Sequence, residues 1–369
     1  MAASPKVVFM NQSQSSIDWF YRGPSKARAE ELGWDIWMNE RDEKLEPEEW
    51  AKVIADADAL LTTWGSPKLD EVILSRADKL KIVAHVGGSV AAIGSDALYE
   101  RSVRVTTAND LMARSVAESC MMMLLMGLRR AHLHVKLGTR SENMVWGKDE
   151  QIQPIQDCAI GIWGYGDIAA WVVRLLQPFE PRETLIVSSH LSDEDAAALG
   201  ASRVSFDELF ERSDVVFTLA GMTVENTGRV GPEQLAAMKD GAIIINVGRA
   251  PLIQPEALVA ELQRGRITGV LDVFEKEPLP EDDPLNSLPN VILQPHNAGT
   301  GRDAHYMAAM LDELERFFGG EELQYEVSAS RGRMMTDMGA VREAQKATAE
   351  PAKQENWLDA HATDQKKDQ

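Results

Sequence analysis

Three residues in the second half of the chain have side chains suited to carbonyl chemistry. Arg249, Glu277 and His296 each come shortly after an apolar run that is typical of a β-strand. The carboxyl ends of parallel strands meet at one edge of a sheet, where α/β proteins bind their ligands. A guanidinium can bind and polarise a carbonyl oxygen, an imidazole can supply a proton, and a carboxylate can keep the imidazole charged. The set therefore predicts reduction of a carbonyl that lies next to a carboxylate.

A glycine-rich segment upstream indicates where the hydride would come from. The apolar run 158–163 leads directly into the sequence Gly-Tyr-Gly-Asp-Ile-Ala, and a helical pattern follows over 170–176. A strand, Gly-x-Gly-x-x-Ala and a helix form the context that a dinucleotide-binding turn requires. The first glycine permits the tight turn, the second lets the backbone approach a pyrophosphate, and the helix N-terminus attracts phosphate. The expected cofactor contacts in this turn are Gly164, Tyr165, Gly166, Asp167 and Ile168.

The order of six segments resembles that of the D-2-hydroxyacid dehydrogenase family, which includes D-3-phosphoglycerate, glyoxylate/hydroxypyruvate, D-lactate and formate dehydrogenases. The resemblance extends over roughly residues 80–305, is loose before that range, and does not reach the last forty residues. The matching segments are 115–118, 161–168, 213–216, 238–249, 271–279 and 289–296.

This resemblance implies a role for each candidate residue. His296 would exchange a proton with the substrate oxygen, Glu277 would fix the tautomer of His296 and favour its charged form, and Arg249 would bind the substrate through two hydrogen bonds. Asp272 would accept a hydrogen bond from the nicotinamide carboxamide. The other expected cofactor contacts are Ser188, Ala220, Gly221, Val247, Gly248, Ala298 and Gly299.

A second loop is predicted to bind the substrate. The segment Gly87-Gly88-Ser89 follows a strand-like run, and its backbone N–H groups could hold the substrate carboxylate, as the corresponding loop of the family does. A plain turn at the end of a strand is the alternative. Trp64 follows another strand-like run and is expected to line the same cleft.

Three positions depart from the family pattern near the cofactor. Ser188 stands where the family usually has an aspartate that binds the adenosine ribose, so no carboxylate is there to reject a 2′-phosphate. NAD is the expected cofactor, and NADP or dual use stays open. Asp167 places an acidic group beside the pyrophosphate, where it suits the helix dipole but repels phosphate. Gly221 replaces a frequent proline in a turn that faces the cofactor.

Strand-like and helical segments alternate along most of the chain, which predicts α/β architecture with parallel sheets covered on both faces. We expect two doubly wound parallel-sheet domains, with a Rossmann dinucleotide-binding domain inserted in a smaller flavodoxin-like substrate domain. The predicted substrate domain is 1–108 plus 300–328, and the NAD(P)-binding domain is 109–299. A long apolar helix over 115–134 is expected to be buried or at an interface. Residues 330–369 are polar and predicted to be a disordered tail, with a docking helix around Trp357 as the alternative.

Composition excludes several classes of function. The net charge of −20 and the pI near 4.8 disfavour binding to nucleic acid or to an anionic membrane. Cys120 and Cys158 are expected to be buried reduced thiols, and no Cys/His spacing predicts a metal site. The first residues carry no long apolar segment typical of a secretory signal, so we expect a cytoplasmic protein. The expected assembly is a homodimer and the expected partner a small 2-oxo or 2-hydroxy acid.

A second hypothesis belongs to a different functional class. The family also contains co-repressors that keep the fold and respond to NAD(H), and they retain the Arg, Glu and His set. The alternative is therefore a dinucleotide-sensing regulatory protein with little turnover.

Overall fold

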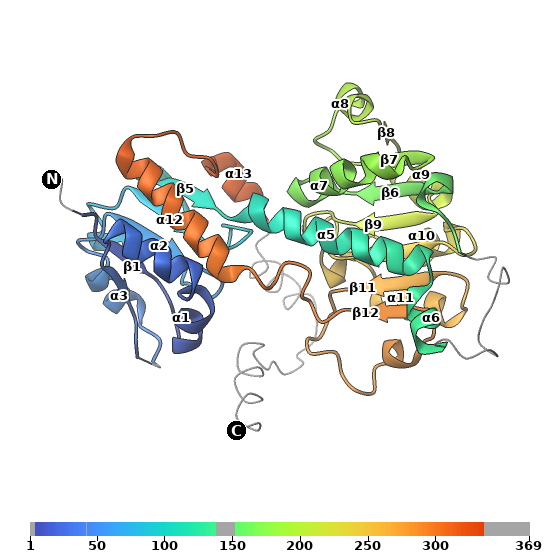
Figure 1. Ribbon diagram of the computed structural model, residues 1–369, viewed down its shortest axis with the longest axis horizontal. Coiled ribbons are helices and arrows are strands. Elements are labelled where there is room, and N and C mark those ends of the chain that lie inside the picture. Colours follow the sequence, from blue (N-terminus) through green and yellow to red (C-terminus); the bar gives the residue numbers. More distant parts are fainter. Residues whose placement is uncertain (1–3, 42, 138–151, 336–369) are drawn as a thin grey trace. The chain divides into compact units, whose positions relative to one another are not determined.

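The computed structural model describes residues 4–41, 43–137 and 152–335 of the 369-residue chain. These residues form two compact units (Figure 1). Unit 1 contains the described residues of Met1–Ser115 and Gly299–Met338, and unit 2 contains those of Val116–Ala298. Each unit is a parallel sheet covered by helices, which confirms the predicted fold of two doubly wound α/β domains.

Unit 1 is built on a five-stranded sheet in the order β2-β1-β3-β4-β5, and all neighbouring strands are parallel. The strands are β1 (Val7–Phe9), β2 (Ile36–Met38), β3 (Ala59–Thr62), β4 (Ile82–His85) and β5 (Arg104–Thr107). Strands β1, β3 and β4 are buried on both faces, as expected for the near-continuous apolar runs of parallel strands, whereas Trp37 of the edge strand β2 is exposed. The last residues of β3, β4 and β5 lie side by side, in the register Thr62, His85, Thr107.

Successive side chains of these strands point to opposite faces of the sheet, so each strand contributes to two apolar clusters. Val7 and Phe9 face α1 (Gln14–Phe20), α2 (Pro24–Leu32) and α12 (Asp303–Gly319). The neighbouring Val8 faces α3 (Pro47–Val53), the 3-10 helix η1 (Ile73–Arg76) and α4 (Asp96–Glu100). Helix α12 comes from the far end of the chain and packs against α2 (Figure 1). Unit 1 is therefore discontinuous in sequence.

Unit 2 is built on a seven-stranded parallel sheet in the order β12-β11-β10-β9-β6-β7-β8. The chain starts in the middle of this sheet, moves out to β8, and returns to the other side of β6 at β9. The direction of strand addition thus reverses between β6 and β9, which is where doubly wound sheets bind ligands. The strands are β6 (Ala159–Trp163), β7 (Glu183–Val187), β8 (Ser202–Arg203), β9 (Val215–Thr218), β10 (Ile243–Asn246), β11 (Thr268–Leu271) and β12 (Val291–Leu293).

Helices cover both faces of this sheet. One face packs against α5 (Asn109–Leu128) and α7 (Asp167–Leu176), with α8 (Asp193–Ala198) at its edge. On the opposite face, Gly161 of β6 lies against α9 (Phe206–Arg212) and Gly269 of β11 lies against α11 (Pro255–Gln263), with α10 (Pro232–Ala237) between those helices. The short elements are α6 (Ala131–Leu137), η3 (Ile155–Asp157), η4 (Gln177–Phe179), η5 (Ala250–Leu252) and η6 (Pro284–Ser287).

The long helix predicted over 115–134 differs from α5 at both ends. α5 begins at Asn109 and ends at Leu128, and Arg130 has a φ of 51°. A left-handed residue interrupts the helical ladder, so the chain restarts as α6. Helix α5 is long and apolar enough to cross a membrane, and 44% of its most apolar stretch of 18 residues is buried within the protein. Cys120 and Met123 belong to the core of unit 2. Buried core helices can have the same length and composition as a membrane span.

The predicted polar tail needs a correction at its start. Residues 329–334 form a further helix, α13 (Ala329–Met334), which Ser328 caps through its side chain. Arg333 bonds to Asp96 at 2.8 Å and stacks over the ring of Tyr99. These contacts hold residues 329–334 in place, whereas the polar composition alone predicts disorder from residue 330. The rest of the predicted tail, with Trp357, lies outside the described residues.

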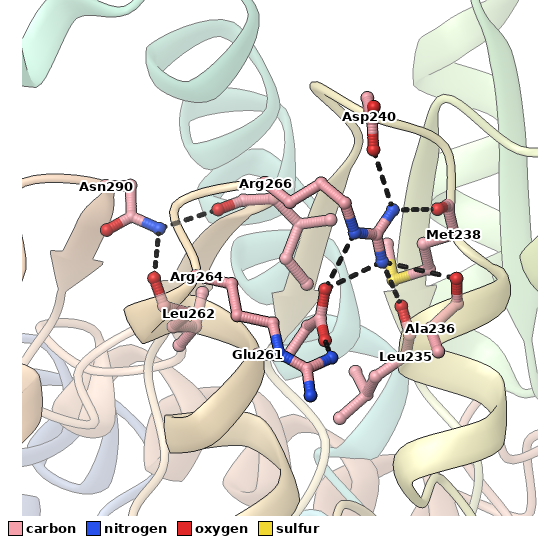
Figure 2. A network of polar contacts seen from close by, with 10 residues as sticks. Leu235, Ala236, Met238, Asp240, Glu261, Leu262, Arg264, Arg266 and Asn290 are labelled. Atoms are coloured by element: carbon pink, nitrogen blue, oxygen red, sulfur yellow. Dashed lines mark hydrogen bonds and ion pairs between the residues drawn. The ribbon is translucent and has the colours of Figure 1, made fainter.

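An ion network centred on the buried carboxylate of Glu261 joins α10, α11 and the turn before β11 (Figure 2). Glu261 on α11 is only 3% exposed, and it accepts from Arg266 at 2.8 Å and from Arg264 at 2.9 Å. Arg266 also donates to the carbonyl oxygens of Leu235, Ala236 and Met238. Asn290 donates to the carbonyl oxygens of Leu262 and Ile267, at 2.9 and 2.7 Å. The network therefore fixes the end of the sheet opposite to the candidate site.

Candidate active site

The candidate catalytic residues follow three adjacent strands of unit 2. Arg249 comes three residues after the end of β10, Asp272 directly follows β11, and His296 comes three residues after the end of β12. Glu277 lies in the loop after β11. Because β10, β11 and β12 are neighbours in one parallel sheet, all four residues leave the same edge. The sheet therefore brings together residues that are 47 positions apart in sequence.

His296 and Glu277 form a direct pair. The Nδ1 atom of His296 lies 2.7 Å from Oε2 of Glu277, and the other carboxylate oxygen accepts from the backbone N–H of Phe274 at 3.0 Å. The Glu277 side chain is 22% exposed and that of His296 is 45% exposed. The carboxylate is thus anchored in its own loop and holds Nδ1, which leaves Nε2 on the side of the ring away from Glu277. This is the geometry of an oriented acid–base imidazole.

The backbone at His296 has a strained conformation. His296 has a φ of 50°, a left-handed conformation that is uncommon for residues other than glycine. Asp272 braces the turn, since its carboxylate accepts from the N–H of Asn297 at 3.0 Å and from the N–H of Ala298 at 3.3 Å. Burial raises the pKa of Asp272, and these two donors act in the opposite direction.

This bracing role of Asp272 was not predicted from the sequence. Its side chain is 1% exposed, and both of its oxygens already accept from backbone groups. The one signal in the sequence is that Asp272 stands directly at the end of a buried strand. Its expected bond to the nicotinamide carboxamide stays a prediction.

Arg249 is held by its own turn. Its Nη1 atom donates to the carbonyl oxygen of Gly248 at 2.7 Å, and its carbonyl oxygen accepts from the side chain of Asn246 at 3.1 Å. Gly248 lies so close to β9 that a Cβ there would be 2.6 Å from the carbonyl oxygen of Thr218. Only glycine fits this position, and the close approach fixes where the guanidinium leaves the sheet.

The predicted dinucleotide turn connects β6 to α7. Gly164 has a φ of 96°, and a Cβ there would lie 2.4 Å from the Cα of Ala220. Gly166 precedes α7, and no atom lies within 4 Å of the position of a Cβ on it. The first glycine therefore lets two backbones approach, and the second leaves open space at the N-terminus of a ten-residue helix. A pyrophosphate fits such a cradle. Asp167 is the first residue of α7, and Tyr165 and Ile168 are partly buried against the core.

The other predicted cofactor contacts lie at the ends of β7, β9, β10 and β12. Ser188 directly follows β7, and its hydroxyl accepts from the N–H of His190 at 3.1 Å. The turn after β9 is held by Asn226, which donates to the carbonyl oxygen of Gly221 at 2.8 Å. This bond restrains the turn in which Gly221 replaces the usual proline. The remaining predicted contacts are mostly buried at these strand ends: Ala220, Val247, Gly248, Ala298 and Gly299.

The predicted substrate loop belongs to unit 1. Gly87-Gly88-Ser89 follows β4, and the hydroxyl of Thr107 lies 2.6 Å from the carbonyl oxygen of Gly87. Trp64 follows the neighbouring strand β3, is 47% exposed, and its ring lies 5.8 Å from that of Phe20. Sequence reasoning did not find Thr107, because it ends a strand that carries no motif.

Two smaller predictions concern cysteines and metals. Cys120 and Cys158 are free and buried, as predicted, and burial raises the pKa of Cys158 to about 11. Among residues 4–41, 43–137 and 152–335, no group of three or more His, Cys, Asp or Glu side chains could hold a metal ion.

Comparison with known proteins identifies the family. Residues 120–298 match the NAD binding domain of the D-isomer specific 2-hydroxyacid dehydrogenases. The chain is 32% identical over 266 residues to a glyoxylate/hydroxypyruvate reductase B from Yersinia enterocolitica, over 71% of this chain and 80% of that protein. The chain belongs to the D-isomer specific 2-hydroxyacid dehydrogenase family. It is therefore an NAD-binding oxidoreductase of the type that acts on the CH–OH group of hydroxy acids.

Two further relatives agree with this assignment. A glyoxylate reductase from Korarchaeum cryptofilum is 32% identical over 303 residues, which is 79% of this chain and 88% of that protein. The crystal structure of a phosphoglycerate oxidoreductase from Rhizobium etli has the same fold, with a TM-score of 0.73 at 22% identity, over 88% of this chain and 98% of that one. The alternative of a regulatory protein is not favoured, because the two relatives at 32% identity are both named as reductases.

The Glu277–His296 pair gives a test by mutation. We expect Glu277→Gln to lower kcat for a 2-oxo acid by about tenfold or more, because an amide holds the imidazole less firmly than a carboxylate does and stabilises a positive charge on it less. Steady-state kinetics of both proteins measure this. Glu275→Gln is the control, since that residue lies in the same loop. Equal kcat values for Glu277→Gln and the wild type would contradict a functional role of the pair.

Proposed function

We propose that the protein reduces a 2-oxo acid to the corresponding D-2-hydroxy acid with NAD(H), and catalyses the reverse oxidation. The His296–Glu277 pair at 2.7 Å carries this proposal, because an imidazole held by a carboxylate is suited to proton exchange with a substrate oxygen. The names of the relatives support a small 2-oxo acid such as glyoxylate or hydroxypyruvate as the substrate.

Each candidate residue has a separate task in this proposal. Arg249 binds the substrate and polarises its carbonyl oxygen. A reduced nicotinamide, when bound, would supply the hydride that is added to the carbonyl carbon. The Nε2 atom of His296 donates its proton to the carbonyl oxygen, and Glu277 stabilises the charged ring before this transfer. Asp272 holds the backbone turn that presents His296. Backbone N–H groups of Gly88 and Ser89 hold the substrate carboxylate, and Trp64 contacts the rest of the substrate.

The residues that would hold the dinucleotide fit that group. Gly164 and Gly166 would form the turn around the pyrophosphate at the N-terminus of α7, and Ser188, which directly follows β7, would lie beside the adenosine ribose. Because Ser188 cannot repel a 2′-phosphate, NADPH is also used, at lower efficiency. A homodimer and a cytoplasmic location complete the proposal.

A substrate panel tests this function. Glyoxylate, hydroxypyruvate, pyruvate and longer 2-oxo acids are offered with NADH and with NADPH, and consumption of the cofactor is followed by its absorbance. We expect at least one 2-oxo acid to reach a kcat/KM of about 10⁴ M⁻¹s⁻¹ or more. Tight binding of NADH without turnover of any 2-oxo acid would contradict the proposal and favour the alternative of a dinucleotide-sensing regulatory protein.

Cofactor choice gives a second prediction. The wild-type preference for NADH over NADPH should be modest, about 5–150-fold in kcat/KM. Ser188→Asp should increase the preference by about tenfold or more, because a carboxylate can bond both ribose hydroxyls and repel a 2′-phosphate. Ser189→Asp is the matched control, since it adds the same charge one residue further along an exposed turn. An unchanged ratio in Ser188→Asp, with a changed one in Ser189→Asp, would place the ribose at Ser189 instead.

A further inference from the structure

The loop after β4 has two successive carbonyl groups directed at one hydroxyl. Oγ1 of Thr107 lies 2.6 Å from the carbonyl oxygen of Gly87 and 2.9 Å from that of Gly88. Thr107 is the last residue of β5 and is 4% exposed. Its partner in the sheet register is His85, the last residue of β4. A single buried side chain on a neighbouring strand thus fixes two consecutive peptide groups.

Fixing the carbonyl groups also fixes the N–H groups. In a planar trans peptide the N–H points opposite to the C=O of the same unit. The carbonyl of Gly87 belongs to the same unit as the N–H of Gly88, and the carbonyl of Gly88 to the same unit as the N–H of Ser89. Both N–H groups are therefore directed away from Thr107, toward the same side. Two successive N–H groups on one side make a concave anion-binding arrangement.

The ring of His85 packs closely against Gly87 of this loop. Its ring is 1% exposed, and Nδ1 lies 3.0 Å from the hydroxyl of Thr62. A Cβ on Gly87 would lie 2.3 Å from Nε2 of this ring, so only glycine fits above it. Among the residues that the structure describes, Nε2 has no hydrogen-bond partner. The ring thus acts as a packing surface under Gly87.

The protonation state of His85 agrees with a role in packing. Burial lowers the pKa of His85 to about 4, and the Ser89 backbone acts in the opposite direction. The ring is therefore neutral at neutral pH. Because the ring carries no charge there, the loop attracts an anion through its backbone N–H groups rather than through the imidazole.

We propose that Thr107 and His85 are positioning residues that hold loop 87–89 in the conformation that binds the carboxylate of a 2-oxo acid. The proposal rests on the proposed function, which assigns the substrate carboxylate to this loop. It adds that recognition of the carboxylate depends on a buried hydroxyl and a buried neutral ring that do not touch the substrate.

The first test removes only the hydroxyl. Thr107→Val keeps the shape of the side chain and releases both carbonyl groups, whereas Thr107→Ser keeps the hydroxyl. We expect Thr107→Val to raise KM for the best 2-oxo acid about 10–100-fold, the range for hydrogen bonds to a charged group, with kcat changed less than about threefold. Thr107→Ser should restore KM to within about threefold of the wild type. Thr106→Val, on the preceding residue of β5, is the control for fold.

Binding measurements separate this inference from the proposed function. Oxamate, an unreactive analogue with a carboxylate, is titrated into the protein–NADH complex of each variant. Its Kd should rise by the same factor as KM in Thr107→Val, while the Kd of NADH is unchanged. Wild-type turnover with equal KM and equal oxamate affinity in Thr107→Val would overturn the positioning role and leave the proposed function intact. A wild type that neither turns over a 2-oxo acid nor binds oxamate would overturn both.

A second pair of variants tests the support by His85, and it also covers the case in which Thr107→Val fails to fold. Gly87→Ala should raise KM and the Kd of oxamate, because the added Cβ meets the ring at 2.3 Å. His85→Ala removes the ring under Gly87 and should also raise the Kd of oxamate about tenfold or more, with the Kd of NADH unchanged. Wild-type oxamate affinity in His85→Ala would contradict the support of the loop by this ring.

Discussion

His296→Asn is expected to lower kcat for the best 2-oxo acid by about 10²–10⁴-fold, the usual contribution of general acid–base catalysis. Asparagine keeps a polar side chain of similar reach but cannot donate a proton to a carbonyl oxygen and take it back. The affinity for NADH should be unchanged, because the glycine turn at Gly164 and the start of α7 are not altered.

Steady-state kinetics and a titration of NADH fluorescence measure these two effects. His305→Asn is the matched control, since it makes the same substitution at an exposed position on α12. The loss should lie in kcat rather than KM, because the substitution leaves Arg249, the proposed substrate-binding residue, unchanged. Turnover within about tenfold of the wild type would assign the proton transfer to another group.

Glu261→Ala is expected to lower the free energy of unfolding by about 2–4 kcal/mol, since it removes the buried carboxylate of Arg266 and leaves only the exposed one of Asp240 at 3.2 Å. Arg266 is 25% exposed and keeps its bonds to the carbonyl oxygens of Leu235 and Met238, so the loss falls below that of a fully buried pair. The midpoint of urea denaturation measures the change.

A surface ion pair provides the control for this variant. Asp193 bonds to Arg203 at 2.8 Å with its side chain 86% exposed, and Asp193→Ala should change stability by less than about 1 kcal/mol. At temperatures where Glu261→Ala is folded, its KM and kcat should match the wild type, because the network lies at the end of the sheet away from the candidate site. Equal losses of stability in Glu261→Ala and Asp193→Ala would show that burial of the pair contributes nothing.

Much of the fold could be predicted because apolar runs and turn residues are local properties of the chain. The strand runs at 7–9, 159–163 and 243–245 are continuous and apolar, as parallel strands with two buried faces require. Gly164 and Gly166 stand directly between a strand-like run and a helical pattern, and this context indicates a dinucleotide turn. Arg249, Glu277 and His296 are candidates because each follows a strand-like apolar run.

Tertiary structure decided which groups support those residues. Asp272 braces the His296 turn through the N–H groups of Asn297 and Ala298, which lie 25 and 26 residues further along the chain. Thr107 reaches the loop at Gly87 only because β5 pairs with β4. Each of these bonds depends on strand order and register, which arise from packing between distant segments. Local sequence therefore selects residues that could act, and the order of the strands determines which others hold them in place.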